Sequence, residues 1–472
     1  MVDRNYRKEE KEIDAYLSRA NKDELVQLLK AKADADPTLR RRLSSKALVS
    51  SERPADIKEH KRIIREALGR NEFVHYRSVS EHTNRLEEAA AGLKDLAQAG
   101  HPREAADLIE FLIDGASKKI EQLDDSDGIF SGFIRGLYDE WGRVWSAIQD
   151  RDPIKLAENV LQRLDDNNYG LADDLIPAMA SALGDEGLNR LERSILPRYE
   201  KWRGSQNLHK ENPKAYLEQS RALRALLDIA DASKDVDRFI ELKKESGLQA
   251  RDLQEIAERL KTAGRLEEAL YYVEQGLSAD RFLGSEGYDL PRLKIEILKG
   301  LKRLDDARSA AWEFFRSSPM TDLLESFLSL TPKGERERAR TEALDYCSNR
   351  SDLSRALGFF MDEKEYARLA EMIRRRPHEL RKFYYATLLP VTDAMEEEYP
   401  NVAIMIYRFL GFQILKDKRS KAYRYAADHF RKVKKLYTRI GKQMTWDRLK
   451  GRIATKHRLK SAFMAYFNKI PS

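Results

Sequence analysis

Apolar residues recur along most of the chain at spacings of three and four, which is the pattern of a helix with one face in a core. A clear example is the stripe formed by Leu137, Trp141, Val144, Trp145 and Ile148. Large apolar side chains at helical spacing usually pack between helices, so we expect this stripe to be buried. No segment shows the alternation of apolar and polar residues that a half-buried strand needs. The pattern therefore predicts an all-α protein.

Three turns of similar sequence separate expected helices, at residues 96–105, 260–269 and 298–307. Each ends on an alanine, and a small residue there lets the next helix approach its neighbour closely. Gly100 and Gly264 supply the positive φ that the C-terminus of a helix often needs. These turns predict that the helices are arranged as pairs.

The spacing of the turns indicates a repeat protein. Ala269 and Ala307 are 38 residues apart, close to the period of tetratricopeptide-like helix pairs. A fourth and weaker copy covers residues 360–367 and ends on Ala367. Because the copies differ so much, we predict an irregular α-solenoid of tetratricopeptide-like helix pairs.

The same signals divide the chain into three segments. Residues 1–50 are expected to form an N-terminal helical hairpin, frayed up to about Ile13, with Asn21 capping its first helix and Asp36-Pro37 starting its second. A serine-rich linker follows at 44–56. Residues 56–400 are expected to form the solenoid. Residues 401–472 are expected to form a basic helical segment that continues or caps it.

The composition indicates the cellular compartment in which the protein is expected. The chain has 472 residues and one cysteine, Cys347, so it can form no intramolecular disulfide. Its opening is charged and lacks the apolar stretch of a signal peptide. The most apolar run, residues 402–415, is too short for a membrane span of about 20 residues and favours a buried helix. We therefore expect a cytoplasmic protein.

The sequence carries no recognisable catalytic, cofactor or metal motif. Phosphate-binding and dinucleotide-binding loops, zinc-protease helices and serine-hydrolase elbows are all missing, and the histidines are scattered. The acidic segment 124–128 lacks the ligands of a calcium loop at the required positions and is expected to cap a helix starting near Ile129. Cys347 is expected to be a small buried residue. We therefore expect no enzyme, no cofactor and no metal.

The distribution of charge along the chain is strongly uneven. From residue 401 onward there are 19 Lys and Arg against three acidic residues, a balance of +16 within a net charge of +7, which leaves the first 400 residues at −9. Within 421–440, an apolar face is expected at Tyr423, Ala426, Ala427, Phe430, Val433, Tyr437 and Ile440. The cations that fall away from this face, together with those of the next expected helix, form a candidate surface for nucleic acid or an acidic partner: Arg424, Arg431, Lys432, Lys434, Lys435, Arg439, Arg448, Lys450, Arg452, Lys456, Arg458 and Lys460.

Three interpretations of this basic segment stay open. It could be a solvated or internally docked end of the solenoid, a binding surface for a phosphate backbone, or a surface for an acidic protein. The aromatic residues of 421–440 fall into the apolar stripe, which argues against the stacking of bases on them.

Several stretches of the chain resemble a helical region found in uncharacterised bacterial proteins, where it often follows a SWIM-type zinc finger. The stretches are 25–43, 99–105, 124–128, 264–269, Trp446, 457–460 and 463–464. The resemblance implies a tetratricopeptide-like helical fold and no established enzymatic activity. The zinc finger itself needs three cysteines and a histidine, and it is absent from this chain, so no metal or nucleic-acid role follows from it.

Together these observations lead to two hypotheses about function. The first is a non-enzymatic helical-repeat scaffold that mediates protein–protein interaction, since solenoids usually act through extended surfaces. The alternative is a nucleic-acid-binding protein that uses the basic C-terminal helices.

Overall fold

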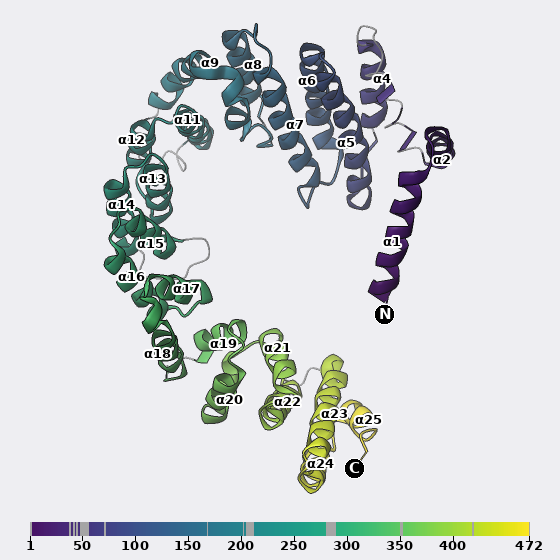
Figure 1. Ribbon diagram of the computed structural model, residues 1–472, viewed down its shortest axis with the longest axis vertical. Helices are drawn as coiled ribbons and strands as arrows, with labels where there is room; N and C mark the ends of the chain where they lie inside the picture. Colours follow the sequence, from purple (N-terminus) through teal and green to yellow (C-terminus); the bar gives the residue numbers. More distant parts are fainter. Residues whose placement is uncertain are drawn as a thin grey trace. The chain divides into compact units, whose positions relative to one another are not determined.

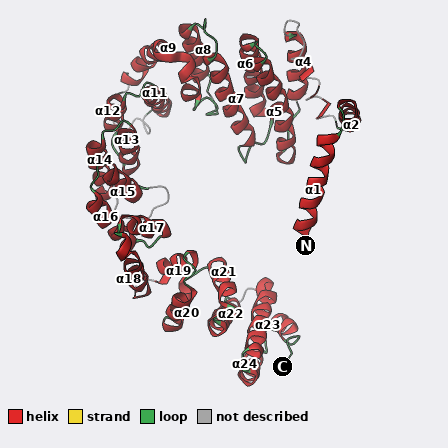
Figure 2. Ribbon diagram, in the orientation of Figure 1, coloured by secondary structure: helices red, strands yellow, loops and turns green. Residues whose placement is uncertain are grey.

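The computed structural model describes residues 2–36, 39–40, 43, 46–47, 56–69, 72–167, 169–201, 203, 212–279, 289–349, 353–417 and 420–471. These residues form helices and short connections and contain no strand (Figure 2). A single isolated bridge joins Val74 to Leu123. The chain divides into two compact units, Met1–Gly247 and Leu248–Ser472.

The first unit is a succession of helices that pack against their neighbours in sequence: α4 on α5, α5 on α6, α6 on α7, α7 and α8 on α9, and α9 on α11 (Figure 1). Its helices are α1 (Val2–Arg19), α2 (Lys22–Ala35), α4 (Ile57–Leu68), α5 (Tyr76–Gln98), α6 (Pro102–Lys119), α7 (Ile129–Ser146), α8 (Pro153–Asp165), α9 (Leu175–Glu200), α11 (Pro213–Ala232) and α12 (Val236–Ser246). One continuous apolar core runs through this unit from Ile64 to Leu242.

The second unit has the same design. Its helices are α13 (Ala250–Thr262), α14 (Leu266–Ala279), α15 (Leu290–Gly300), α16 (Leu304–Ser317), α17 (Thr321–Leu330), α18 (Arg336–Asn349), α19 (Leu353–Asp362), α20 (Tyr366–Arg375), α21 (Tyr385–Met395), α22 (Pro400–Lys416), α23 (Tyr423–Arg439), α24 (Gln443–His457) and α25 (Ser461–Phe467). Consecutive helices pack together through most of the unit. Stacked and edge-on rings of Phe430, Phe463 and Phe467 fill its C-terminal core. Each unit is thus an irregular α-solenoid, and the predicted fold class is confirmed.

Six turns in the described part of the chain share one backbone geometry. A central residue has a φ between 57° and 99°, and the N–H of the next residue donates to the carbonyl five positions earlier, as from His101 to Leu96 at 3.3 Å. This is the Schellman motif, which satisfies carbonyls left unpaired at the end of a helix. The central residues are Gly100, Lys234, Gly264, Lys302, Lys364 and Gly441.

The residue five positions after each central residue is buried in the core. These residues are Ala105, Phe239, Ala269, Ala307, Leu369 and Trp446. The three main predicted turns are therefore confirmed. The fourth turn is also present, but its buried residue is Leu369, whereas the predicted Ala367 is exposed. The reason is that the left-handed residue, Lys364, sets the position of the packing residue.

Several smaller predictions can be compared with the structure. Asn21 accepts a hydrogen bond from the N–H of Glu24 at 2.8 Å, as expected of a cap. Residues 402–415 lie in α22, and no helix of the described ranges is long and apolar enough to cross a membrane. In the predicted stripe on α7, Trp141 is fully buried and Trp145 is partly exposed.

Helix α1 begins at Val2 and includes the stretch up to Ile13 for which a frayed start is expected. Its sequence is rich in Glu, Lys and Arg, which favour helix. Pro37 and most of the expected 44–56 linker lie outside the described residues. The boundary between the compact units falls within the predicted 56–400 solenoid, and the basic segment from 401 onward is part of the second unit.

Candidate functional site

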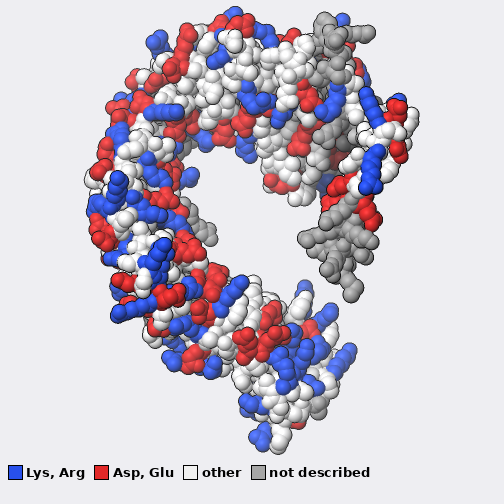
Figure 3. Space-filling view, viewed as in Figure 1, with Lys and Arg blue, Asp and Glu red and all other residues white. Residues whose placement is uncertain are grey.

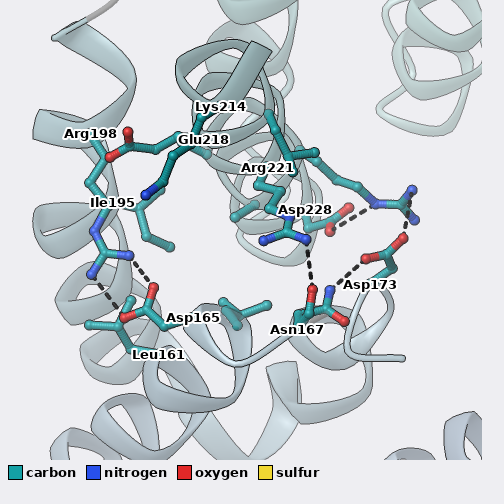
Figure 4. A pocket seen from close by; sticks show the side chains of 15 residues that line it. Leu161, Asp165, Asn167, Asp173, Ile195, Arg198, Lys214, Glu218, Arg221 and Asp228 are labelled. Atoms are coloured by element: carbon teal, nitrogen blue, oxygen red, sulfur yellow. Dashed lines mark hydrogen bonds and ion pairs between the residues drawn. The ribbon is translucent and has the colours of Figure 1, made fainter. Parts of the chain in front are cut away.

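A hollow of about 520 Å³ lies in the first unit between α8, α9 and α11, and we call it the α8–α11 hollow (Figure 4). Its apolar lining consists of Leu161, Leu164, Ile195, Leu217, Ala222 and Ala225. Its charged lining consists of Asp165, Asp173, Arg198, Lys214, Glu218, Arg221, Arg224 and Asp228. The hollow therefore combines apolar surface with charges of both signs.

Capping residues fix where two of the helices around this hollow begin. Asp152 caps α8 by accepting from the N–H groups of Ile154 and Lys155 at 3.0 and 3.1 Å, with Pro153 at the first helical position. Asn212 caps α11 in the same way. Such caps satisfy N–H groups that a helix leaves unpaired at its start.

The loop between α8 and α9 is tied to α11 through Asn167. The side chain of Asn167 accepts from the N–H of Ala172 at 3.1 Å and donates to Asp173 at 2.7 Å. Arg221, on α11, donates to the carbonyl of Asn167 at 2.8 Å (Figure 4). These hydrogen bonds hold the rim of the hollow in place.

Ion pairs connect the cations of the hollow to nearby carboxylates. Arg198 pairs with Asp165. Arg224 lies 3.2 Å from Asp174, 3.9 Å from Asp173 and 4.0 Å from Asp228. Burial raises the pKa of Asp228 to about 7, partly opposed by the positive charge of Arg224. Asp228 is therefore a carboxyl that titrates near neutral pH.

A second, more polar hollow of about 700 Å³ lies between α6, α7 and α8 and shares Asn167 with the first. The guanidinium of Arg163 lies 5.2 Å from the centroid of the Trp141 ring. It forms ion pairs with Glu110 at 3.0 Å and Asp114 at 2.8 Å. These contacts connect three helices, so Arg163 has a structural role beside its place in the hollow.

Sequence reasoning missed both hollows. The residues of the α8–α11 hollow span positions 161–228, and no motif links them. The one local signal in the sequence is the acidic and amide-rich stretch that begins with Asp165 at the end of α8 and includes Asn167 and Asp173 of the following loop. Only the packing of α11 against α9 brings Arg221, Arg224 and Asp228 to this loop.

The predicted basic residues lie on α23, on α24 and just beyond it. On α23 the predicted apolar face is buried except for Ile440, which is partly exposed, and the cations lie away from it. In Figure 3, blue side chains gather over these C-terminal helices beside a red group. The structure therefore confirms the predicted division of α23 into a buried apolar face and a charged face.

The cations toward the end of α23 are partly neutralised by the connection between α21 and α22. Lys432 forms an ion pair with Glu396 at 2.6 Å, and Arg439 donates to the carbonyl of Glu397 at 3.5 Å. Burial works to raise the pKa of Glu396, but hydrogen bonds from Lys432 and Tyr407 hold it below its usual range. In this part of the basic segment, Lys432 is docked on a carboxylate and Arg439 on a backbone carbonyl of the same unit.

Other predicted cations have no such partner. Arg431 pairs with Asp428 on its own helix, and Lys460 lies 3.1 Å from the hydroxyl of Tyr423. Seven of the predicted residues form neither an ion pair nor a side-chain hydrogen bond within the described residues: Arg424, Lys434, Lys435, Arg448, Arg452, Lys456 and Arg458. Part of the basic segment thus keeps its charge available.

The other candidates for metal binding or reactivity are the acidic segment 124–128 and Cys347, and both have structural roles. Within the described ranges, no three His, Cys, Asp or Glu side chains are placed to hold a metal ion. Asp125 accepts from the N–H groups of Phe130 and Ser131 at 2.8 and 2.9 Å, so the acidic segment caps α7 as predicted. Cys347 is buried, as predicted.

The sequence model of a protein family of unknown function, DUF6880, matches residues 15–465 of the chain. The chain belongs to this family. The match extends across both compact units, so the DUF6880 region includes the α8–α11 hollow and nearly all of the basic segment. The family's description states no activity. No curated relative matches the chain in sequence.

Two solved helical proteins are among those similar to the chain. The human IFIT1 dimer with PPP-AAAA has 13% sequence identity and a TM-score of 0.19, covering 82% of this chain and 96% of its own. A circular tandem repeat protein has 13% identity and a TM-score of 0.16, covering 91% and 96% respectively. Likeness at this level supports no conclusion about function.

Proposed function

We propose that this DUF6880 protein is a non-enzymatic helical-repeat scaffold that binds a segment of a protein partner in the α8–α11 hollow. The observation that carries the proposal is the mixed lining of this hollow, with apolar side chains beside placed charges of both signs. Sites that bind protein segments combine apolar contact area with a few oriented polar groups. Solenoids commonly bind partners through surfaces formed between their helices.

Substitution of Leu217 gives the most direct test of the proposal. It lies in the hollow and is 49% exposed, so an apolar partner side chain would cover surface that is now in water. Covering such a leucine contributes on the order of 1–2 kcal/mol to binding.

The experiment places a photo-crosslinking phenylalanine analogue at Leu217 in the native cell and identifies the crosslinked protein by mass spectrometry. The affinity of that protein for the purified chain is then measured with Leu217→Asp. We expect binding at least about tenfold weaker.

The matched control is Leu304→Asp, which changes a leucine of similar exposure at the start of α16 in the second unit. It should leave the affinity unchanged, and circular dichroism should show that both variants stay folded. Equal binding by wild type and Leu217→Asp would contradict the proposal, as would the absence of any protein crosslinked from the hollow.

A second candidate function is nucleic-acid binding by the C-terminal helices, favoured by the exposed cations that have no carboxylate partner. Replacing Arg448 and Arg452 with Glu should weaken binding of a labelled oligonucleotide and lower its salt dependence by about one phosphate per residue. The control is Lys58→Glu with Lys94→Glu, an equal change of charge on exposed residues of α4 and α5. Binding that both pairs of substitutions weaken equally would argue against a defined site.

A further inference from the structure

Three tyrosines of the second unit have rings that are open to solvent. Tyr384 is 85% exposed, Tyr425 is 57% exposed and Tyr385 is 46% exposed. Tyr384 and Tyr385 stand at the start of α21, and Tyr425 lies in the first turn of α23. Exposed rings that stand singly are common, but exposed rings from elements that pack close together can form a binding surface.

The packing of α21 against α22 and of α22 against α23 brings Tyr385 close to α23. The Tyr385 ring lies 5.7 Å from the ring of His429, a buried residue of α23. Tyr425 precedes His429 by four residues and therefore lies one turn away on the same face of α23. We call Arg381, Tyr384, Tyr385, Arg424 and Tyr425 the tyrosine surface.

Cations surround these rings. Arg381 and Lys382 are separated from the tyrosines of α21 by Phe383, and both are exposed. Lys421 and Arg424 flank the start of α23, and both are exposed. Lys460, from the connection after α24, lies 5.5 Å from the Tyr423 ring, so the end of α24 adds charge at this end of α23. The positive residues come from three separate parts of the chain.

The acidic residues close to the rings offset this charge only in part. Asp428 pairs with Arg431, and Asp393 accepts a hydrogen bond from Tyr407 at 3.1 Å. Burial raises the pKa of the Tyr385 hydroxyl, and Asp393 lies close enough to raise it further. Glu379 is buried, where it accepts from the N–H of Leu353 and pairs with Lys382. The Glu396 group that neutralises Lys432 lies at the other end of α21.

Helix stability does not account for Arg424. The first turn of α23 holds no acidic residue, although the helix dipole favours acids there and disfavours cations such as Arg424. A negatively charged ligand at this end of α23 would explain why a cation stands there.

We propose that the tyrosine surface binds single-stranded nucleic acid, with bases stacked on Tyr384 and Tyr425 and phosphates held by Arg381 and Arg424. Proteins that bind single strands combine exposed aromatic rings with basic residues along the backbone. A duplex keeps its bases stacked inside and offers no free base face, so it does not use the exposed rings. This proposal rests on the second candidate function and gives it a site.

The test is fluorescence anisotropy of the full-length chain with a fluorescein-labelled oligoadenylate of about 12 nucleotides, at about 50 mM salt. Tyr384→Ala and Tyr425→Ala should each weaken binding about tenfold, whereas Tyr384→Trp should retain it, because each lost ring removes one stacked base. An abasic oligomer of the same length and charge should bind about 100-fold more weakly. A labelled duplex of the same length should not lose affinity in the alanine variants.

Tyr271→Ala is the matched control, because Tyr271 is 58% exposed on α14 of the same unit. It should bind like the wild type, and the thermal midpoints of all variants should agree. Equal binding by wild type and both alanine variants would overturn the tyrosine surface, as would equal binding of the abasic oligomer.

The outcomes separate this proposal from the function on which it rests. If reversal of Arg448 and Arg452 weakens binding but the tyrosine variants do not, the second candidate function stands and the tyrosine surface is wrong. If the oligoadenylate and the duplex both fail to bind at low salt, both are wrong. Binding of a protein segment in the α8–α11 hollow is unaffected by either result.

Discussion

The α8–α11 hollow and the tyrosine surface both carry many charged groups, but they hold them differently. In the hollow, Arg198 and Arg224 are paired with carboxylates of their own unit, and apolar side chains lie beside them. On the tyrosine surface, Arg424 forms no ion pair with a carboxylate of the described residues, and the apolar material consists of exposed rings.

The difference indicates two modes of recognition. Charges that are already paired contribute little long-range attraction, so a hollow of this kind selects its ligand by shape and by local hydrogen bonds. Cations without partners attract an anion over a Debye length, which is about 10 Å at 0.1 M salt. The second surface is therefore expected to be far more sensitive to salt than the first.

The largest expected effect is a loss of folding stability in the first unit, which contains the hollow. A Cβ added at Gly142 would overlap the carbonyl oxygen of Ala178, where α7 packs closely on α9. Gly142→Ala should therefore destabilise the first unit by about 3 kcal/mol or more. Denaturant unfolding measures this, and oligonucleotide binding by the second unit should survive.

Gly132→Ala is the matched control for that substitution. Gly132 lies on the same helix, and no atom lies within 4 Å of an added Cβ. Because alanine favours helix, this variant should be more stable than wild type by up to about 1 kcal/mol. Equal losses of stability in the two variants would show that α7 and α9 are not in close contact.

The next effect concerns pH and Asp228. Its pKa in the folded chain is about 7, above the ordinary value of 3.8, so the folded state holds an additional proton between about pH 4 and 7. Stability from this group is therefore present below pH 4 and is lost as the pH rises through 7. Asp228→Asn should stabilise the first unit by roughly 2 kcal/mol at pH 8 and have no effect below pH 4. Unfolding curves at the two pH values test this, and a pH-independent effect would contradict it.

A salt titration tests directly whether binding at the two surfaces differs in its dependence on salt. If about three phosphates are bound at the C-terminal helices, raising salt from about 50 to 200 mM should weaken oligoadenylate binding about 20-fold. Partner binding in the α8–α11 hollow should change by less than about threefold, because Arg198 and Arg224 are already paired with carboxylates there. Equal slopes for the two ligands would mean that the surfaces do not differ as described.

The smallest effect concerns the turns next to the two surfaces. Lys234 follows α11 and Lys364 precedes α20, and both have a φ of 57°, which is unfavourable for a residue with a side chain. Lys234→Gly and Lys364→Gly should each raise stability by about 1 kcal/mol without changing binding. Gly264→Ala should have the opposite effect, and thermal unfolding distinguishes the three variants.

The helix pairs could be predicted where their turns carried a familiar residue. Gly100 and Gly264 were found because glycine favours positive φ, and the Lys302 turn was found through its similarity to them. The turns at Lys234 and Gly441 were missed because their packing residues are Phe239 and Trp446, not the expected small residue. Ala367 was chosen in the fourth turn for its size, although Leu369 occupies the buried position.

The candidate sites were less accessible to prediction. The aromatic residues of 421–440 are expected in the apolar stripe, but Tyr425 is 57% exposed among the cations, and its proposed role depends on Tyr384, about 40 residues earlier in the chain. The sequence around Asp228 does not indicate a carboxyl with a raised pKa, because the shift comes from burial of Asp228 among groups on other elements.

The sequence by itself determined the all-α class, several helix caps, the turns between helix pairs and the division of α23 into a buried and a charged face. All of these depend on hydrogen bonds and apolar periodicity within about ten residues, and such local signals can be read directly from the chain. Tertiary structure decided which cations are neutralised, which rings stay exposed and where a hollow forms. These features depend on contacts between helices distant in sequence, as when α11 packs on α9 and the start of α21 meets α23. No local pattern specifies such contacts.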